Sequence, residues 1–217
     1  MVEPDPAADA IFCPSRVWSR SEVLARPSPV PGVPGVYGWW FRGLLEEVVT
    51  SSCIDFQGLK LLYVGIAPRG PALSKATLRS RLRAHYTGNA EGSTLRLTLG
   101  CVLGLELRRS RSGRTMTFGP HETDLSQWMA ENAFVTWVEH NQPWVLEASL
   151  IGRLDLPLNL EQNSHHIFHV RLAQLRRDAR AGSLGVTELG RLSAKALGLE
   201  TSVVRPTLLN SFQVRLG

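Results

Sequence analysis

The chain has 217 residues, enough for one domain with a hydrophobic core and some extensions, and its 43% apolar and 20% charged residues are typical of a globular protein. It holds no apolar stretch long enough to span a bilayer, and its start lacks the features of a secretory signal. Three scattered cysteines argue against a disulfide framework or a cysteine-rich zinc site. We therefore expect a cytoplasmic protein with no membrane partner.

The formal net charge is +5 and the sequence pI is about 9.6. Arginine supplies most of the cations, and its planar guanidinium suits phosphate better than the point charge of lysine does. The excess is modest, but it is compatible with a polyanionic partner such as nucleic acid.

The N-terminal arm, residues 1–34, is rich in proline, which argues against regular helix or central strand. We expect this arm to pack on the domain or to be partly disordered. Two strands are predicted next, GVYGWWF at residues 35–41 and LKLLYVGIA at residues 59–67. An insertion at about residues 42–59 separates them.

The sequence TLRSRLRAHY at residues 77–86 predicts a helix, and Ser93 caps a second helix that runs to about Leu103. A second insertion covers about residues 104–132. It begins with the basic hairpin LELRRSRSGRTMTF and ends with a short helix at residues 126–132.

AFVTWVEH at residues 133–140 predicts another strand, and Pro143 opens a helix that runs to about residue 154. Residues 164–217 form a basic, helical C-terminal extension, with a helix at about residues 171–180 and a weaker helical pattern at about residues 187–198. This order of elements predicts an α/β (α+β) fold in which a small mixed sheet is flanked by helices.

The two strands carry tyrosines whose faces can be predicted. Alternate residues of a strand share a face, so Tyr37 goes with Trp39, and Tyr63 goes with Leu61 and Gly65. If the strands pair antiparallel, the two tyrosines project near each other. Taken alone, two strand tyrosines are more often core aromatics than site residues.

The helix at residues 77–86 directs two polar groups toward the sheet. Leu78 and Leu82 define its buried stripe, and Arg81 and His85 lie at or beside that stripe as an i, i+4 pair. Taken alone, Arg81 is best interpreted as a partner in a salt bridge at the rim of the core.

Glu147 is more informative because it lies inside the apolar stripe of its helix, with Leu150 and Ile151. A carboxylate directed at a core costs free energy unless it is paired or binds a cation. Glu147 is therefore either buried against an arginine or a metal ligand at the edge of a cleft.

Taken in chain order, these groups resemble the GIY-YIG nuclease superfamily over about residues 35–163. Valine replaces isoleucine in both signature triplets, a conservative exchange on a strand. The resemblance implies a small, mainly antiparallel three-stranded sheet flanked by helices, here with an inserted hairpin and a helical tail. The matching elements are GVY at 35–37, YVG at 63–65, Leu78 with Arg81 and His85, Glu147 followed by Leu150 and Ile151, and PLN at 157–159.

The resemblance also implies catalytic roles. Tyr37 corresponds to the tyrosine near the attacking water, which acts as the base once its proton is lost, and His85 assists proton transfer. Tyr63 orients the scissile phosphate. Arg81 holds that phosphate and stabilises charge in the transition state.

The same resemblance makes Glu147 the only protein ligand of a Mg²⁺ or Mn²⁺ ion. One carboxylate is chemically sufficient because Mg²⁺ commonly keeps several waters. Asn159 would secure the geometry of the site.

One departure from the family concerns a lysine that many relatives carry soon after the second triplet. Ala67 and Pro68 stand there in this chain, and Arg69 or Lys75 are the alternatives for the same role. None of the departures removes a chemical group of the core set, so we favour an active enzyme over a relic.

Basic residues outside the core set are candidates for contact with DNA. The alternative interpretation for each of them is a side chain exposed to solvent. A contact with a DNA phosphate would weaken with increasing salt and would not depend on the base sequence. The candidates are Arg79, Arg83, Arg96, Arg109, Arg111 and Arg114.

Two features of the tail stay open at this point. The helix at residues 171–180, with Arg176 and Arg177, either tracks phosphates or docks on the domain. His165, His166 and His169 have the spacing of a metal site only if their segment is helical. We favour a polar surface loop for them.

The first hypothesis is a metal-dependent endonuclease that acts on double-stranded or branched DNA in restriction, defence or repair. One active site cuts one strand, so double-strand cleavage requires a homodimer or two successive nicks. The alternative is a catalytically silent DNA-binding module with the same fold. A third hypothesis is a zinc protein built on the histidine cluster.

Overall fold

A computed structural model of the chain describes residues 6–43, 47–70, 75–110 and 115–181. At its centre is a sheet with the strand order β2-β3-β1-β6, in which all neighbours are antiparallel. This confirms the α/β (α+β) class with a mainly antiparallel sheet. The sheet contains β1 (Gly35–Phe41), β2 (Asp55–Phe56), β3 (Leu59–Ala67) and β6 (Ala133–Glu139).

The sheet has four strands rather than the three that were predicted. The additional strand, β2, is only two residues long and pairs with the first two residues of β3. A segment this short carries no alternation that a sequence pattern could reveal. The other three strands begin and end where the apolar runs do.

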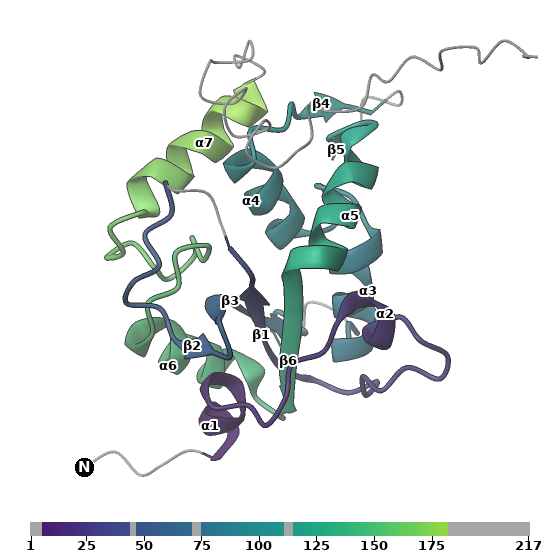
Figure 1. The fold of residues 1–217 in the computed structure, drawn as a ribbon, viewed down its shortest axis with the longest axis vertical. Helices are drawn as coiled ribbons and strands as arrows, with labels where there is room; N and C mark the ends of the chain where they lie inside the picture. Colours follow the sequence, from purple (N-terminus) through teal and green to yellow (C-terminus); the bar gives the residue numbers. More distant parts are fainter. Residues whose placement is uncertain (1–5, 44–46, 71–74, 111–114, 182–217) are drawn as a thin grey trace, which may run out of the picture.

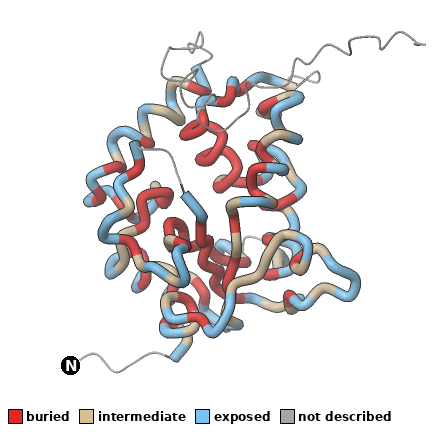
Figure 2. The backbone as a smooth tube through the Cα atoms, in the orientation of Figure 1, coloured by how far each residue is buried: buried red, intermediate tan, exposed pale blue. Residues whose placement is uncertain are grey.

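The central strand β1 is buried along its whole length because helices cover both faces of the sheet (Figures 1 and 2). Its odd-numbered side chains, such as Tyr37 and Trp39, belong to one hydrophobic cluster, and Val36 and Trp40 belong to the other. A strand buried on both faces has a continuous apolar sequence, as residues 35–41 do.

Two groups of helices enclose the sheet. On the Tyr37 face lie α3 (Leu78–Thr87), α4 (Thr94–Val102) and α5 (His121–Asn132). On the opposite face lie α1 (Pro6–Phe12) and α6 (Pro143–Arg153). The short α2 (Arg20–Val23) contacts α3 and α5, and α7 (His169–Ala181) packs against α4.

The N-terminal arm contains α1 and α2, so the prediction that it excludes regular helix was wrong. Proline is tolerated in the first turn of a helix, where its missing N–H has no partner in any case, and Pro6 begins α1. The second helix starts at a capping box in which Ser19 and Glu22 bond to each other's backbone N–H.

The predicted hairpin is present as β4 (Arg108–Arg109) and β5 (Met116–Thr117). Helix α5 begins five residues before the expected start at Ser126, and α7 begins two residues before residue 171. The helical pattern at residues 187–198 lies outside the described residues. In the part of the chain that is described, no helix combines the length and apolarity needed to cross a bilayer.

A bulge in β3 changes one predicted face. Tyr63 lies opposite Trp39 and Leu61 lies opposite Trp40, so the pairing register shifts by one residue between them. Leu61 therefore faces the cluster opposite to that of Tyr63, contrary to strict alternation. The bulge leaves Tyr63 on the same face as Tyr37.

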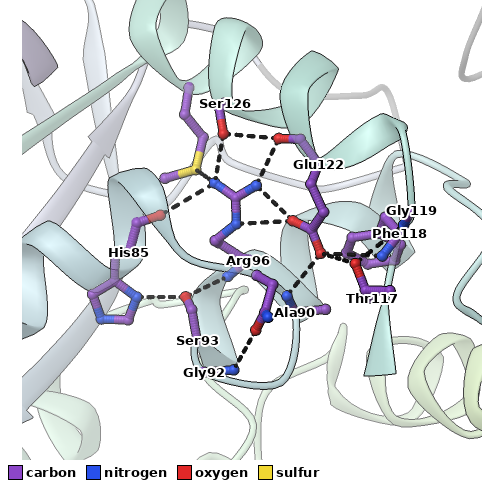
Figure 3. A network of polar contacts seen from close by, with 12 residues as sticks. His85, Ala90, Gly92, Ser93, Arg96, Thr117, Phe118, Gly119, Glu122 and Ser126 are labelled. Atoms are coloured by element: carbon purple, nitrogen blue, oxygen red, sulfur yellow. Dashed lines mark hydrogen bonds and ion pairs between the residues drawn. The ribbon is translucent and has the colours of Figure 1, made fainter. Parts of the chain in front are cut away.

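Arg96 was predicted to contact DNA, and this prediction was wrong because the side chain is fully buried. Its guanidinium binds the carboxylate of Glu122 on α5, with an Nη2 to Oε2 distance of 2.6 Å. It also donates to the Ser126 hydroxyl and to the His85 backbone carbonyl (Figure 3).

The second oxygen of the Glu122 carboxylate also has hydrogen-bond partners. Its Oε1 accepts hydrogen bonds from the backbone N–H of Ala90 at 2.9 Å and of Phe118 at 3.1 Å. The network of Arg96 and Glu122 therefore ties α3, α4 and α5 and the segments between them into one unit.

We expect Glu122→Ala to lower the free energy of unfolding by about 3–5 kcal/mol, because it leaves the Arg96 guanidinium buried without its carboxylate. Urea unfolding measures this. The control is Asp124→Ala, which removes the exposed partner of His121 on the same helix and should cost less than about 1 kcal/mol. Equal losses in the two variants would contradict the importance of the buried pair.

Candidate active site

A cleft of about 340 Å³ lies beside β3 and brings together residues from both strands of the motif, from α3 and from α6. Both faces of the sheet contribute, since the segment that follows α6 passes along β3. The polar and aromatic residues in its lining are Tyr37, Tyr63, Arg69, Arg81, Thr94, Trp144, Glu147, Asn159, Glu161, Gln162 and Arg176.

Tyr37 and Tyr63 project from neighbouring strands on one face of the sheet. Tyr37 is paired with Gly65, and its ring crosses directly over that glycine. A Cβ at position 65 would lie 2.7 Å from the Tyr37 hydroxyl oxygen, well inside contact distance. The group that requires a glycine at this position is therefore the Tyr37 ring.

The Tyr37 hydroxyl is hydrogen-bonded to His85 on α3. Its oxygen lies 2.8 Å from Nε2, and Nδ1 of the same ring lies 2.7 Å from the Ser93 hydroxyl. The Ser93 oxygen also accepts the backbone N–H of Arg96 as the N-cap of α4 (Figure 3). The histidine ring is thus held at both nitrogens.

Burial determines the protonation of this pair. Burial and the neighbouring arginines, Arg81 first, lower the pKa of His85 well below its usual value, so the ring is neutral. Burial also raises the pKa of Tyr37, although the Arg81 guanidinium opposes the rise. The hydrogen bond therefore joins a neutral phenol to a neutral imidazole, the arrangement from which a proton can pass from oxygen to nitrogen.

Two arginines bring positive charge into the cleft. Arg81 on α3 bonds to the Gly92 backbone carbonyl, and its Nε is buried with no hydrogen-bond partner in the part of the chain that the structure describes. Arg69 bonds to the Thr94 hydroxyl. Within the described ranges, neither arginine forms an ion pair with a carboxylate, so both guanidinium groups retain donors for an anion.

Glu147 enters the cleft from α6, whose neighbouring side chains Leu146, Leu150 and Ile151 are buried. It forms no hydrogen bond or ion pair with any residue that the structure describes. Burial raises its pKa to about 7, the nearby Glu161 adds to the rise, and Arg69 opposes it. The alternative of burial against an arginine is therefore not what the structure shows.

Asn159 holds the segment after α6 against β3. Its side-chain oxygen accepts the Val64 backbone N–H at 2.9 Å, and its side-chain nitrogen donates to the Val64 carbonyl at 2.8 Å. The amide thus replaces a neighbouring strand at this position of β3. This contact aligns one wall of the cleft, next to Tyr63.

The chain matches a protein-family model described as the GIY-YIG catalytic domain over residues 35–178. The chain belongs to this family. No curated protein and no solved structure matches it in the two other comparisons. The membership establishes a nuclease-type domain in general terms.

The structure brings the GIY-YIG motif residues together in one place. Tyr37, Tyr63, Arg81, Glu147 and Asn159 all line the cleft, and His85 lies behind Tyr37. The two signature triplets lie side by side as paired segments of β1 and β3.

Three further DNA-contact candidates are described, and none of them lines the cleft. Arg79 and Arg83 are exposed on α3, and Arg79 donates to the Val30 carbonyl of the N-terminal arm. Arg109 is exposed on β4. Arg111 and Arg114 lie outside the described residues.

The sequence left open whether Arg69 or Lys75 takes the place of the family lysine. Arg69 lines the cleft, and its charge acts on Glu147, whereas Lys75 is exposed and does not line it. Arg69 is therefore the one that the geometry favours. Its position in an irregular loop gave no pattern from which this could be predicted.

Sequence analysis missed two contributors to the site. Ser93 was predicted to cap its helix, and nothing in the sequence shows that it contacts His85. Arg176 on α7 was grouped with other basic residues of the tail, although its place between the buried Leu172 and Ala179 could have shown that it faces inward.

The zinc hypothesis finds no support. His166 is hydrogen-bonded to Asp155, while His165 is exposed and His169 begins α7. Among the described residues there is no group of three or more histidine, cysteine, aspartate or glutamate side chains placed to share a metal.

The raised pKa of Glu147 predicts a pH-dependent cost to stability. The folded state binds the proton of the Glu147 carboxyl group more tightly than the unfolded state does. The free energy of unfolding therefore falls as pH rises from about 4.5 to about 7, and it stays lowered above that pH. In metal-free buffer Glu147→Gln should be more stable than the wild type at about pH 8, by at most about 3 kcal/mol, and nearly equal to it at about pH 4.

Urea unfolding at both pH values tests this, with Glu139→Gln on the exposed end of β6 as the control. If the difference in unfolding free energy between Glu147→Gln and the wild type did not change with pH, the pKa of the Glu147 carboxyl group would not be raised in the folded protein.

Proposed function

We propose that the protein is a metal-dependent DNA endonuclease that hydrolyses phosphodiester bonds. One observation carries the proposal: Glu147 and Arg81, neither of which forms an ion pair among the described residues, line the same cleft as Tyr37, whose hydroxyl is hydrogen-bonded to His85. These are the groups that phosphodiester hydrolysis needs, namely a place for a metal ion, a route for the proton of water and a cation for the phosphate.

Glu147 is the residue that would hold Mg²⁺ or Mn²⁺. Its carboxylate has no partner among the described residues, it lines an open cleft, and oxygen is the ligand atom that these ions prefer. An ion bound there would stabilise the negative charge that develops on the leaving oxygen. The exposed Glu161 adds negative charge to the same cleft without being required as a ligand.

The proton of the attacking water would leave through Tyr37 and His85. A neutral imidazole has one N–H, so Tyr37 can donate to Nε2 only when Nδ1–H donates to Ser93. In that state the phenol passes its proton to His85 as its oxygen takes the proton of the water. Ser93 is then a positioning residue, because it selects the tautomer that can accept.

Arg81 would bind the scissile phosphate from the side of α3, with Tyr63 beside it. A guanidinium binds two phosphate oxygens at once, and in a water-poor cleft such contacts are strengthened. Arg69 lies in the same lining and supplies a second cation in the place of the family lysine.

Contacts with the rest of the duplex would come from exposed arginines on α3 and the hairpin. We assign Arg79, Arg83 and Arg109 to this role on their exposure, and Arg111 and Arg114 on the sequence alone. Such contacts add affinity without sequence selectivity. Cleavage of both strands at one site would require two copies of the chain or two successive nicks.

Glu147→Ala should reduce the cleavage of plasmid and branched DNA by at least about a thousandfold in Mg²⁺ or Mn²⁺, because the metal loses its protein ligand. DNA binding should remain close to that of the wild type. The control is Glu139→Ala, which removes an exposed carboxylate at the end of β6 that does not line the cleft, and it should cleave normally.

Cleavage by Glu147→Ala at the wild-type rate would refute the metal assignment. Normal DNA binding by the wild type with no cleavage in either metal would instead favour a catalytically silent DNA-binding module.

Arg81→Ala should lower the cleavage rate by about a hundredfold to a thousandfold and also weaken DNA binding, since one cation serves both the bound phosphate and the transition state. Single-turnover rates and binding in EDTA separate the two effects. Arg83→Ala, on the exposed side of the same helix, loses the same charge outside the cleft, so it should weaken DNA binding but leave the single-turnover rate of bound DNA unchanged. If the two variants cleave alike, Arg81 is not at the phosphate.

A further inference from the structure

Arg176 is directed into the protein although it belongs to the C-terminal helix. Leu172 and Ala179, one turn before and one turn after it on α7, are both buried, and this stripe packs against α4. Arg176 lies within the stripe, so its side chain reaches the active-site cleft. Arg177, the next residue, is exposed and donates to Gln174.

The charge of the Arg176 guanidinium is only partly balanced within the described residues, where the Glu161 carboxylate acts on it without forming an ion pair. Across the described part of the chain no ion pair joins it to a carboxylate, and its Nε is buried without a hydrogen-bond partner. Burial and the charge of Arg180 lower the pKa of Arg176. A partly buried, unpaired cation costs free energy in the free protein, and a bound anion would offset that cost.

A second hollow of about 230 Å³ continues from the cleft at this point. Arg180 lines it as a third cation, and Glu91 and Glu161 are the carboxylates in its lining. The residues common to both hollows are Arg69, Thr94, Glu161 and Arg176. A basic path therefore runs from the cleft to α7.

We propose that this second hollow binds another backbone phosphate of the DNA strand, beside the scissile one, with Arg176 as its main ligand and Arg69 between the two. The assignment rests on the proposed function. A nucleic acid strand carries phosphates at regular intervals, so a strand with one phosphate at Arg81 presents others to neighbouring cations. Such a contact sets the register of the strand in the cleft and reads no base.

The test compares Arg176→Met with Arg177→Met in the full chain. Methionine keeps the apolar part of the side chain and removes the charge, so both variants lose the same charge from the same helix. Binding of a short labelled DNA duplex is measured in EDTA, where no cleavage occurs, between about 50 and 200 mM salt.

Arg176→Met should weaken binding by about tenfold or more and reduce the slope of log affinity against log salt by about one. Arg177→Met should remain within about threefold of the wild type. Equal losses in the two variants would overturn the subsite and leave the nuclease proposal standing. Absence of DNA binding by the wild type would overturn both.

Thermal unfolding of the free proteins gives a second, independent outcome. Removing an unpaired cation should leave Arg176→Met at least as stable as Arg177→Met. A lower unfolding temperature for Arg176→Met would mean that Arg176 has a partner within the folded chain, and it would overturn the subsite.

Discussion

The buried ion pair between Arg96 and Glu122 is the interaction on which the active-site side of the molecule depends. The Arg96 guanidinium donates to the backbone carbonyl of His85, and the Arg96 backbone N–H donates to the Ser93 hydroxyl. The same hydroxyl is hydrogen-bonded to the His85 ring. The orientation of the histidine, and through it of Tyr37, therefore follows from a pair that lies outside the family motif. An insertion supplies Glu122, so the insertion is part of the support of the site.

Arg96 and the two arginines Arg81 and Arg176 differ in their partners. Arg96 is fully buried and uses its donors on a carboxylate, two carbonyls and a hydroxyl. Arg81 and Arg176 lie at the cleft, and the Nε of each is buried with no hydrogen-bond partner among the described residues. Glu147 is the corresponding acid, partly buried and likewise without a partner in that part of the chain. Partly buried charged side chains without an ion-pair partner lower the stability of the free protein. They are typically retained at active sites, where a ligand or substrate can pair with them.

Much of the fold and most of the motif residues could be predicted from the sequence, because local patterns determine them. The apolar run at residues 35–41 and the place of Glu147 in an apolar stripe needed no knowledge of the rest of the chain. The burial of Arg96 could not be predicted, since its partner Glu122 is remote in sequence and lies on an inserted helix. The face of Leu61 could not be predicted either, because a bulge leaves no mark in a pattern of alternation.

The close passage of Tyr37 over Gly65 makes the two signature triplets a single unit, although they are distant in sequence. The three atoms nearest to a Cβ at position 65 all belong to Tyr37, so the tyrosine is the main reason for the glycine. In a descendant that had lost the tyrosine, any small side chain could settle at position 65 at no cost. If tyrosine were later restored at position 37, its ring would clash with the side chain at position 65. Reversing the loss of the tyrosine would therefore require two substitutions.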